Sequence, residues 1–132
     1  MKSERAKIEG KLDKEFSRFV RMRFADENGY VTCCTCNRFM HWKEGDCGHF
    51  MSRRHKFIRW NDWNALFQCK SCNSYRSGEQ YKMAKSIDSR FGIGTAQLMD
   101  RMRHQTKKWT IGELREKLEY FKEKANRLER SL

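Results

Sequence analysis

Two pairs of cysteines are the residues of this sequence whose types and spacing most clearly indicate chemistry. Two residues separate Cys33 from Cys36, and the same gap separates Cys69 from Cys72. A C-x-x-C turn lets two thiolates reach one ion, and two such turns supply the four soft ligands that Zn²⁺ binds tetrahedrally. Because four thiolates leave the ion no open position, we expect one structural zinc that closes the loop between the pairs.

Two further cysteines lie outside this framework. Cys34 adjoins the first pair, but only Cys33 has the two-residue gap to Cys36. Cys47 either replaces one of the four ligands or is a small buried residue, and we favour the second interpretation.

The loop between the cysteine pairs also carries residues suited to phosphodiester hydrolysis. An imidazole can generate a nucleophile from water near neutral pH, and a hard cation such as Mg²⁺ or Mn²⁺ can hold the phosphate. The order of His49, Asn64 and Asn73 around the second cysteine pair resembles the HNH (ββα-metal) arrangement of nucleases. That resemblance implies that His49 is the general base, that Asn64 holds its hairpin and that Asn73 binds the cation.

The cation needs further oxygen ligands. Many HNH enzymes place an acidic residue or a histidine directly before the base, where this chain has Gly48. Asp46, Asp62 and Glu79 are the nearest carboxylates. We favour Glu79, because it follows Asn73 by six residues at the expected start of a helix, and we keep Asp46 as the second candidate ligand.

The remaining histidines compete for the role of base. His41 stands beside Trp42 in an expected hairpin arm and is interpreted as structural. His55 follows two arginines and is interpreted as facing phosphate, and His104 as a surface residue.

The charge of the chain favours a polyanionic partner. Twenty-nine Lys and Arg against 17 Asp and Glu give a net charge of +12, and nucleic acid is the usual partner of such a protein. Contacts to phosphate would supply affinity without reading bases. The basic residues expected to bind DNA are Arg53, Arg54, Lys56, Arg59 and Lys70. Trp60 and Trp63, which lie among them, are interpreted as core residues rather than stacking platforms.

These motifs in combination resemble the NinG (Rap) family of lambdoid-phage recombination proteins. The resemblance spans roughly residues 30–95 and lies in Gly48-His49-Phe50, Arg59-Trp60, Asn64, Gln68-Cys69, Cys72-Asn73, Gly78 and Tyr81. It implies a structure-specific endonuclease that cuts branched recombination intermediates such as Holliday junctions and D-loops. The two C-x-x-C turns followed by an asparagine are also similar to phage recombination endonuclease VII.

A small fold must hold these residues in place. We expect one α+β domain over residues 1–132, with a zinc-stapled ββα-metal core over residues 30–80. Apolar residues at steps of three and four predict an amphipathic helix over residues 3–25 that covers this core. The polar face of this helix could also meet DNA through its basic residues, which are Lys7, Lys11, Lys14, Arg18, Arg21 and Arg23.

Short strands are expected around the cysteine pairs. Residues 30–32 lead into the first C-x-x-C turn, and residues 39–42 lead out of it. Residues 45–50 are predicted as one arm of a second hairpin. Residues 60–68 are interpreted as a loop that leads into either a short helical segment or the second C-x-x-C turn.

The C-terminal region, residues 81–132, is predicted to be helical. One helix should end at Gly92-Ile93-Gly94, and a second should cover residues 95–107. The last begins at Thr110, with Glu113 completing a capping box. Its apolar residues form a short heptad-like seam that either packs on the core or pairs with a second subunit as a homodimer.

Composition limits the remaining choices. Only 38% of residues are hydrophobic and 35% are charged, so the core is small and a metal staple suits it. We find no ~20-residue apolar span and no apolar leader, and we therefore expect a protein of the reducing cytoplasm, that of the host cell if phage-encoded, with no membrane partner. Two rival functions remain: a non-catalytic zinc module that binds DNA or RNA, and a recombination adaptor that acts through the last helix.

Overall fold

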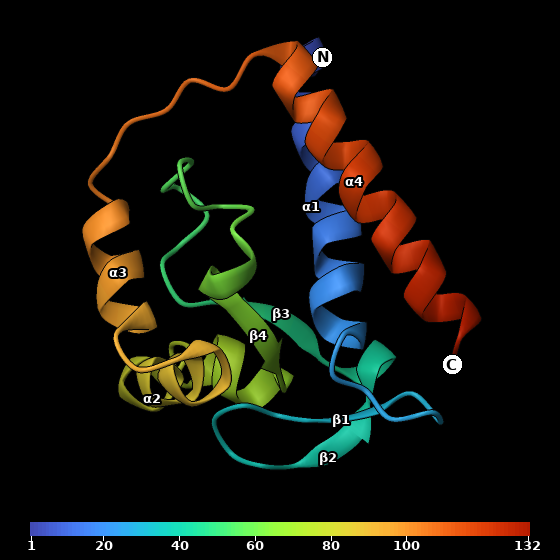
Figure 1. Ribbon diagram of the computed structural model, residues 1–132, viewed down its shortest axis with the longest axis vertical. Helices are drawn as coiled ribbons and strands as arrows, with labels where there is room; N and C mark the ends of the chain where they lie inside the picture. Colours follow the sequence, from blue (N-terminus) through green and yellow to red (C-terminus); the bar gives the residue numbers. More distant parts are fainter.

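The protein is a mixed α+β structure in which helices surround two antiparallel β-hairpins (Figure 1). The computed structural model describes residues 1–132. The helices are α1 (Glu4–Met22), α2 (Gln80–Phe91), α3 (Thr95–Met102) and α4 (Ile111–Arg130). The strands are β1 (Tyr30–Thr32), β2 (Phe39–His41), β3 (Asp46–His49) and β4 (Ala65–Gln68), joined in part by the short helical turns η1 (Trp42–Glu44), η2 (Asp62–Asn64) and η3 (Ser71–Tyr75).

Helix α1 forms where the apolar periodicity predicts it. Ser3 caps the helix, because its side-chain oxygen accepts the backbone N–H of Ala6 at 3.1 Å. Leu12, Phe16 and Val20 are fully or almost fully buried along one face. This face packs on β3 and β4, so the helix covers the second hairpin as expected.

Helix α4 lies beside α1 and runs in the same direction (Figure 1). Glu4 pairs with Arg115 near the start of both helices, and Arg18 pairs with Glu129 at 2.8 Å near their ends. This parallel arrangement requires the extended segment 103–110, which carries the chain from the end of α3 back to the start of α1. The capping box at the start of α4 is present as predicted.

The heptad-like seam of α4 packs within the chain. Leu114, Phe121 and Ala125 are buried in the same apolar cluster as the inner face of α1. The first of the two alternatives for this seam is therefore the one observed, and a homodimer through α4 would have to use the other face of the helix.

Strand β4 corrects the expectation of a loop and helical segment over residues 60–68. Residues 65–68 pair with β3 in the register Asp46↔Gln68 to His49↔Ala65, and only residues 62–64 are helical. All four residues of β4 are buried, because α1 covers one face of the hairpin while α2 and α3 cover the other. A strand buried on both faces lacks the alternation that marks a strand in a sequence.

A second, smaller apolar cluster lies on the far side of the hairpin. Leu66 of β4 meets Met83 and Ile87 of α2 and Met99 of α3 there. Gly92 and Gly94 adopt positive φ angles of 118° and 96°, which end α2 at the predicted position and turn the chain into α3. Helix α3 ends at Met102 rather than at residue 107. No helix combines the length and apolar character needed to cross a bilayer.

Candidate metal centre and the adjoining cavity

The four cysteines of the two C-x-x-C pairs converge on one point. The ligand atoms of Cys33, Cys36, Cys69 and Cys72 all lie within 4.8 Å of one another, and none forms a disulfide. The turn after β1 supplies the first pair, and the end of β4 with the start of η3 supplies the second. The donor set is four sulfur atoms, which suits a tetrahedral, structural zinc ion. The four cysteines are therefore positioned to bind one metal ion, as predicted.

Metal binding requires these thiols to ionise. Burial raises the pKa of Cys33, but backbone N–H groups, first that of Cys69 at 3.3 Å from its sulfur, outweigh burial and lower the pKa to about 6. Burial raises the pKa of Cys72 to about 12. Four crowded thiols cannot all ionise at neutral pH without a compensating positive charge, and a bound divalent ion would supply it.

The other two cysteines lie outside the cluster. Cys34 packs its sulfur 3.4 Å from that of Met83 in the second apolar cluster, and burial raises its pKa. Burial also raises the pKa of Cys47 to about 12. Both therefore behave as small packing residues, in agreement with the interpretation favoured for Cys47.

A polar cavity of about 480 Å³ opens beside the metal centre. It brings together α1, β3, the segment after β3 and the turn η3, which are distant in the sequence. The eight residues that line it are Asp13, Ser17, Asp46, Cys47, His49, Ser52, Arg53 and Asn73. Two of the three residues predicted for catalysis, His49 and Asn73, thus share one open surface.

The ring of His49 is held in one orientation. Its Nε2 lies 3.0 Å from the backbone carbonyl oxygen of Arg59, and Phe16 packs against it with ring centroids 5.7 Å apart. A carbonyl oxygen only accepts, so Nε2 carries the proton of the neutral ring and Nδ1 keeps a free lone pair. Burial lowers the pKa of His49, and the nearby Arg53 lowers it further, although the bond to Arg59 opposes both. The neutral ring is therefore the main form at neutral pH.

Asp46 and Asn73 meet at the end of the cavity nearest the thiol cluster. The Asn73 side-chain nitrogen donates to one oxygen of Asp46 at 3.1 Å, and Lys70 binds the other oxygen at 2.8 Å. Burial tends to raise the pKa of Asp46, but these two hydrogen bonds outweigh it and keep the pKa low. Because Asn73 directly follows Cys72, the metal centre fixes the position of this pair.

Asn64 does not line the cavity but anchors the segment next to it. Its side chain is fully buried; it accepts from the backbone N–H of Met51 at 2.9 Å and donates to the carbonyl oxygens of Met51 and Ile58 at 2.9 and 3.3 Å. These bonds pin the chain that leaves β3 directly after His49. Asn64 thus links the segment after His49 to the residues just before β4, and its role in catalysis stays a prediction.

Gly48 is required by the packing of the second hairpin. A Cβ atom on this residue would lie 2.3 Å from the side-chain oxygen of Gln68. Gln68 is itself buried and donates to Thr35 at 3.1 Å and to the carbonyl oxygen of Gly78 at 2.8 Å. A ligand side chain at the position before His49 would therefore require the buried Gln68 to move, and Asp46 is the carboxylate of β3 that reaches the cavity.

The favoured ligand Glu79 is not brought to this cavity. It stands in a left-handed conformation (φ 51°) at the N-terminus of α2 and pairs with Lys82 at 3.1 Å. Asp62 likewise does not line the cavity. Turns in the chain point both carboxylates away from the cavity. The spacing of residues along the sequence does not predict the direction of these turns.

The other histidines also lie away from the cavity. His41 caps η1, because its Nδ1 accepts the backbone N–H of Lys43 at 3.2 Å, and this agrees with its structural interpretation. His55 lies near Arg54 and Arg103; some burial and these charges lower its pKa.

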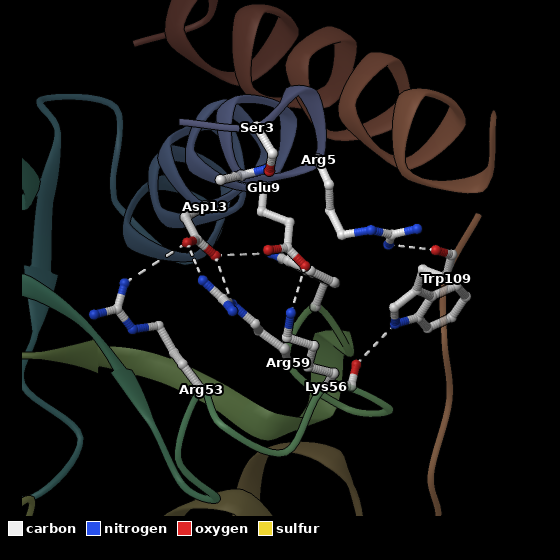
Figure 2. Close-up of polar contacts among 10 residues, drawn as sticks. Ser3, Arg5, Glu9, Asp13, Arg53, Lys56, Arg59 and Trp109 are labelled. Carbon is white, nitrogen blue, oxygen red and sulfur yellow. Dashed lines mark hydrogen bonds and ion pairs between the residues drawn. The ribbon is translucent and has the colours of Figure 1, made fainter. Parts of the chain in front are cut away.

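The residues predicted to bind DNA differ in the exposure of their side chains and in their ion pairs (Figure 2). Arg53 is 62% exposed at the cavity, and Arg54 is exposed. Arg59 is only 16% exposed, because Asp13 of α1 holds its guanidinium through bonds of 3.1 and 2.6 Å. Lys56 pairs with the buried Glu9, also on α1, and Lys70, which is exposed, pairs with Asp46.

The basic residues of α1 also fall into an exposed group and a group that binds other parts of the fold. Lys7, Lys11 and Lys14 are exposed. Arg23 is partly buried and donates to the carbonyl oxygens of Asp62 and Ala65, and desolvation of its guanidinium lowers its pKa to about 10. Arg18 pairs with α4. The arginines therefore join elements of the fold, and the lysines are the residues of α1 left to meet a polyanion.

Asp13 is the residue of the cavity that the sequence did not reveal. It stands on α1, far along the chain from the cysteine pairs, and nothing in its immediate sequence marks a site. One signal was present: Glu9, Asp13 and Ser17 are spaced by four and form a polar row next to the apolar stripe of an otherwise basic helix.

The fold and the four-cysteine centre define a small mixed α+β protein with a structural metal site. Residues 1–131 match the family described as NinG, Bacteriophage Lambda NinG protein, and the chain belongs to this family of phage recombination-related proteins. No curated protein and no solved structure gives a significant match to the chain.

Proposed function

We propose that this protein is a nuclease that hydrolyses phosphodiester bonds in branched DNA with the help of a divalent cation. The observation that carries the proposal is the polar cavity, where an oriented neutral histidine, a carboxylate and a carboxamide converge beside an exposed arginine. The hairpin β3–β4 and the helical segment after it have the order of a ββα-metal core, with His49 on the first strand and Asn73 after the last cysteine.

His49 has the properties of a general base. Its Nε2 is engaged by the Arg59 carbonyl oxygen, so Nδ1 is the nitrogen able to take a proton from water. Its lowered pKa keeps this nitrogen unprotonated near neutral pH. Proton transfer to a positioned imidazole contributes about 10²–10⁴-fold to such reactions.

Asp46 and Asn73 supply the oxygen atoms that Mg²⁺ or Mn²⁺ prefers. Asp46 has its pKa lowered and is therefore ionised, and Asn73 lies within hydrogen-bond distance of it. Both oxygens of Asp46 are bonded, one to Lys70 and one to Asn73, and a cation would take the place of the exposed Lys70 on the carboxylate. When bound, a hard cation would neutralise charge on the scissile phosphate and stabilise the leaving oxygen.

DNA is supported as the substrate by charge and by family. The chain carries a net charge of +12, and Arg53, exposed at the cavity, and the exposed Arg54 next to it in the chain can contact phosphates. Branched DNA follows from membership of a recombination-related phage family, since a branch point brings several phosphates together.

The test is cleavage of a fluorescent four-way junction with and without Mg²⁺. We expect the wild-type protein to cut only with the cation, and His49→Ala and Asn73→Ala each to reduce the rate by about 10²-fold or more with little change in junction affinity. His41→Ala is the matched control, because His41 lies outside the cavity, and should cut within about twofold of wild type.

Tight binding of the junction without cutting, in the presence of either Mg²⁺ or Mn²⁺, would overturn the proposal and leave a non-catalytic zinc module that binds DNA. Equal cutting by wild type and His49→Ala would remove His49 from the mechanism.

A further inference from the structure

We propose that Asp13, on helix α1, is a positioning residue that holds the orientation of His49 through the backbone of Arg59. This inference rests on the proposed function, because it concerns how the base of that reaction is prepared. It assigns to α1 a part in the site beyond covering the hairpin.

Asp13 is the most heavily bonded carboxylate near the cavity (Figure 2). One oxygen accepts from Arg59 Nε at 3.1 Å and from the indole N–H of Trp60 at 2.9 Å. The other accepts from the Arg59 guanidinium at 2.6 Å and lies 3.7 Å from Arg53. Two consecutive side chains of the loop before β4 are thus fixed to one carboxylate.

The backbone between these two anchored side chains carries the oxygen that orients the base. The peptide bond between Arg59 and Trp60 contains the carbonyl group of Arg59. The oxygen of this carbonyl accepts a hydrogen bond from Nε2 of His49 at 3.0 Å. With both neighbouring side chains held by Asp13, this carbonyl has little freedom to turn away. The base therefore keeps Nε2 protonated and Nδ1 free.

The same contacts argue against Asp13 as a ligand of the proposed cation. Both of its oxygens accept from the largely buried Arg59, and one also accepts from the indole of Trp60, whereas the bonds of Asp46 come from the exposed Lys70 and from Asn73, itself a proposed ligand. A cation at Asp13 would have to displace Arg59, but a cation at Asp46 would displace only an exposed lysine. Loss of Asp13 should therefore change the rate and not the cation requirement.

Glu9 offers a matched control one helical turn earlier. It is also an acidic residue of α1 that binds the same loop, through Lys56 at 2.9 Å, but no bond links it to Arg59 or His49. Substitution of Glu9 therefore removes a contact between α1 and the loop without disturbing the support of the histidine.

The experiment compares Asp13→Asn with Asp13→Glu and Glu9→Gln in the full, zinc-loaded chain. Asparagine keeps the shape of Asp13 but cannot accept from Arg59 at both oxygens. We expect Asp13→Asn to slow junction cleavage about 10–100-fold, with half-saturating Mg²⁺ and junction affinity within about twofold of wild type. Asp13→Glu should recover part of the rate, and Glu9→Gln should cut like wild type.

A second measurement does not depend on cleavage. In wild type, ¹⁵N NMR of the His49 ring should show protonated Nε2 and unprotonated Nδ1, and Asp13→Asn should shift these signals toward a mixture of tautomers, while Glu9→Gln leaves them unchanged. If the protein does not cut DNA but the ring responds in this way, the proposed function fails and the positioning role stands.

The positioning role itself is overturned by unchanged ring signals and an unchanged rate in a folded Asp13→Asn protein. A rise in the Mg²⁺ requirement of that variant would overturn it as well, because Asp13 would then be acting as a ligand of the cation.

Discussion

The thiol cluster and the polar cavity are neighbours built in opposite ways. The cluster draws its four ligands from two short turns, and three of its four cysteines are buried. The cavity draws its residues from four separate segments and remains open. Asp46 and Asn73 lie where the two regions meet, since Asn73 follows the last cysteine and bonds to the strand that carries His49. We therefore expect the closed region to contribute mainly to stability and the open region to the proposed reaction.

Loss of the metal should produce the largest effect. In Cys69→Ser, or after treatment with a strong zinc chelator, we expect the chain to lose about 5 kcal/mol or more of folding free energy, because a small core depends on the ion. Thermal unfolding followed by circular dichroism, together with zinc content, measures this. Cys47→Ala is the control and should keep one zinc per chain. An equal loss of zinc in Cys47→Ala would show that a residue of the cavity also contributes to zinc binding, and would contradict the separation of the two regions.

Asn64 tests whether the cavity side also carries stability. Asn64→Ala leaves the N–H and carbonyl of Met51 without their buried partner, and we expect a loss of about 2–4 kcal/mol in urea unfolding. Amide exchange at residue 51 should accelerate. Asn61→Ala, which removes only the cap of η2, should lose about 1 kcal/mol. If the two variants are equally stable, Asn64 does not hold the segment after His49.

Gly48 tests the physical link between the regions, because the Gln68 side chain that crosses it also reaches Thr35 beside the thiol cluster. Gly48→Ala should displace Gln68, lower stability by about 1–3 kcal/mol and weaken zinc retention against a competing chelator. Gly10→Ala is the matched control, since no atom lies within 4 Å of the added methyl on α1. That change should be neutral or stabilising by about 0.5–1 kcal/mol. Unchanged zinc retention in Gly48→Ala would show that the regions are uncoupled.

The pH dependence should be the mildest effect. In the proposed reaction neutral His49 is the base, so the cleavage rate at saturating Mg²⁺ should fall as pH falls through a pKa that burial has lowered below the usual value of about 6.5. The rate should change by less than about twofold between pH 7 and 8. Arg53→Gln removes a charge that lowers this pKa and should move the midpoint upward. A midpoint above neutral pH in wild type would contradict the environment described for His49.

Parts of this fold could be read from local residues alone. The start of α4 followed from Thr110 and Glu113, and the end of α2 followed from two glycines with positive φ angles. Each of these features depends on hydrogen bonds or backbone angles within a few residues, so the sequence contains the whole cause. Strand β4 was missed because both of its faces are buried by helices that lie far from it in the chain.

In the candidate site, too, residues that depend on local spacing were predicted and residues that depend on packing between elements were not. His49 and Asn73 were predicted from their offsets within a short hairpin motif, and both line the cavity. Asp13 was missed, and Glu79 was preferred to Asp46, because only the packing of α1 and the direction of α2 decide which carboxylates face the cavity. The spacing of residues along a chain does not predict contacts between helices and strands that are distant in the sequence.

The sequence by itself determined the four-thiol metal centre, the helical periodicities and the basic character of this protein, because ligand spacing, amphipathic patterns and charge are local or additive properties. The tertiary structure alone decided that α4 covers α1, that β4 is a buried strand, and that Asp13 and Asp46 join His49 around one cavity. Those outcomes depend on which surfaces bury each other, and burial is a property of the whole fold.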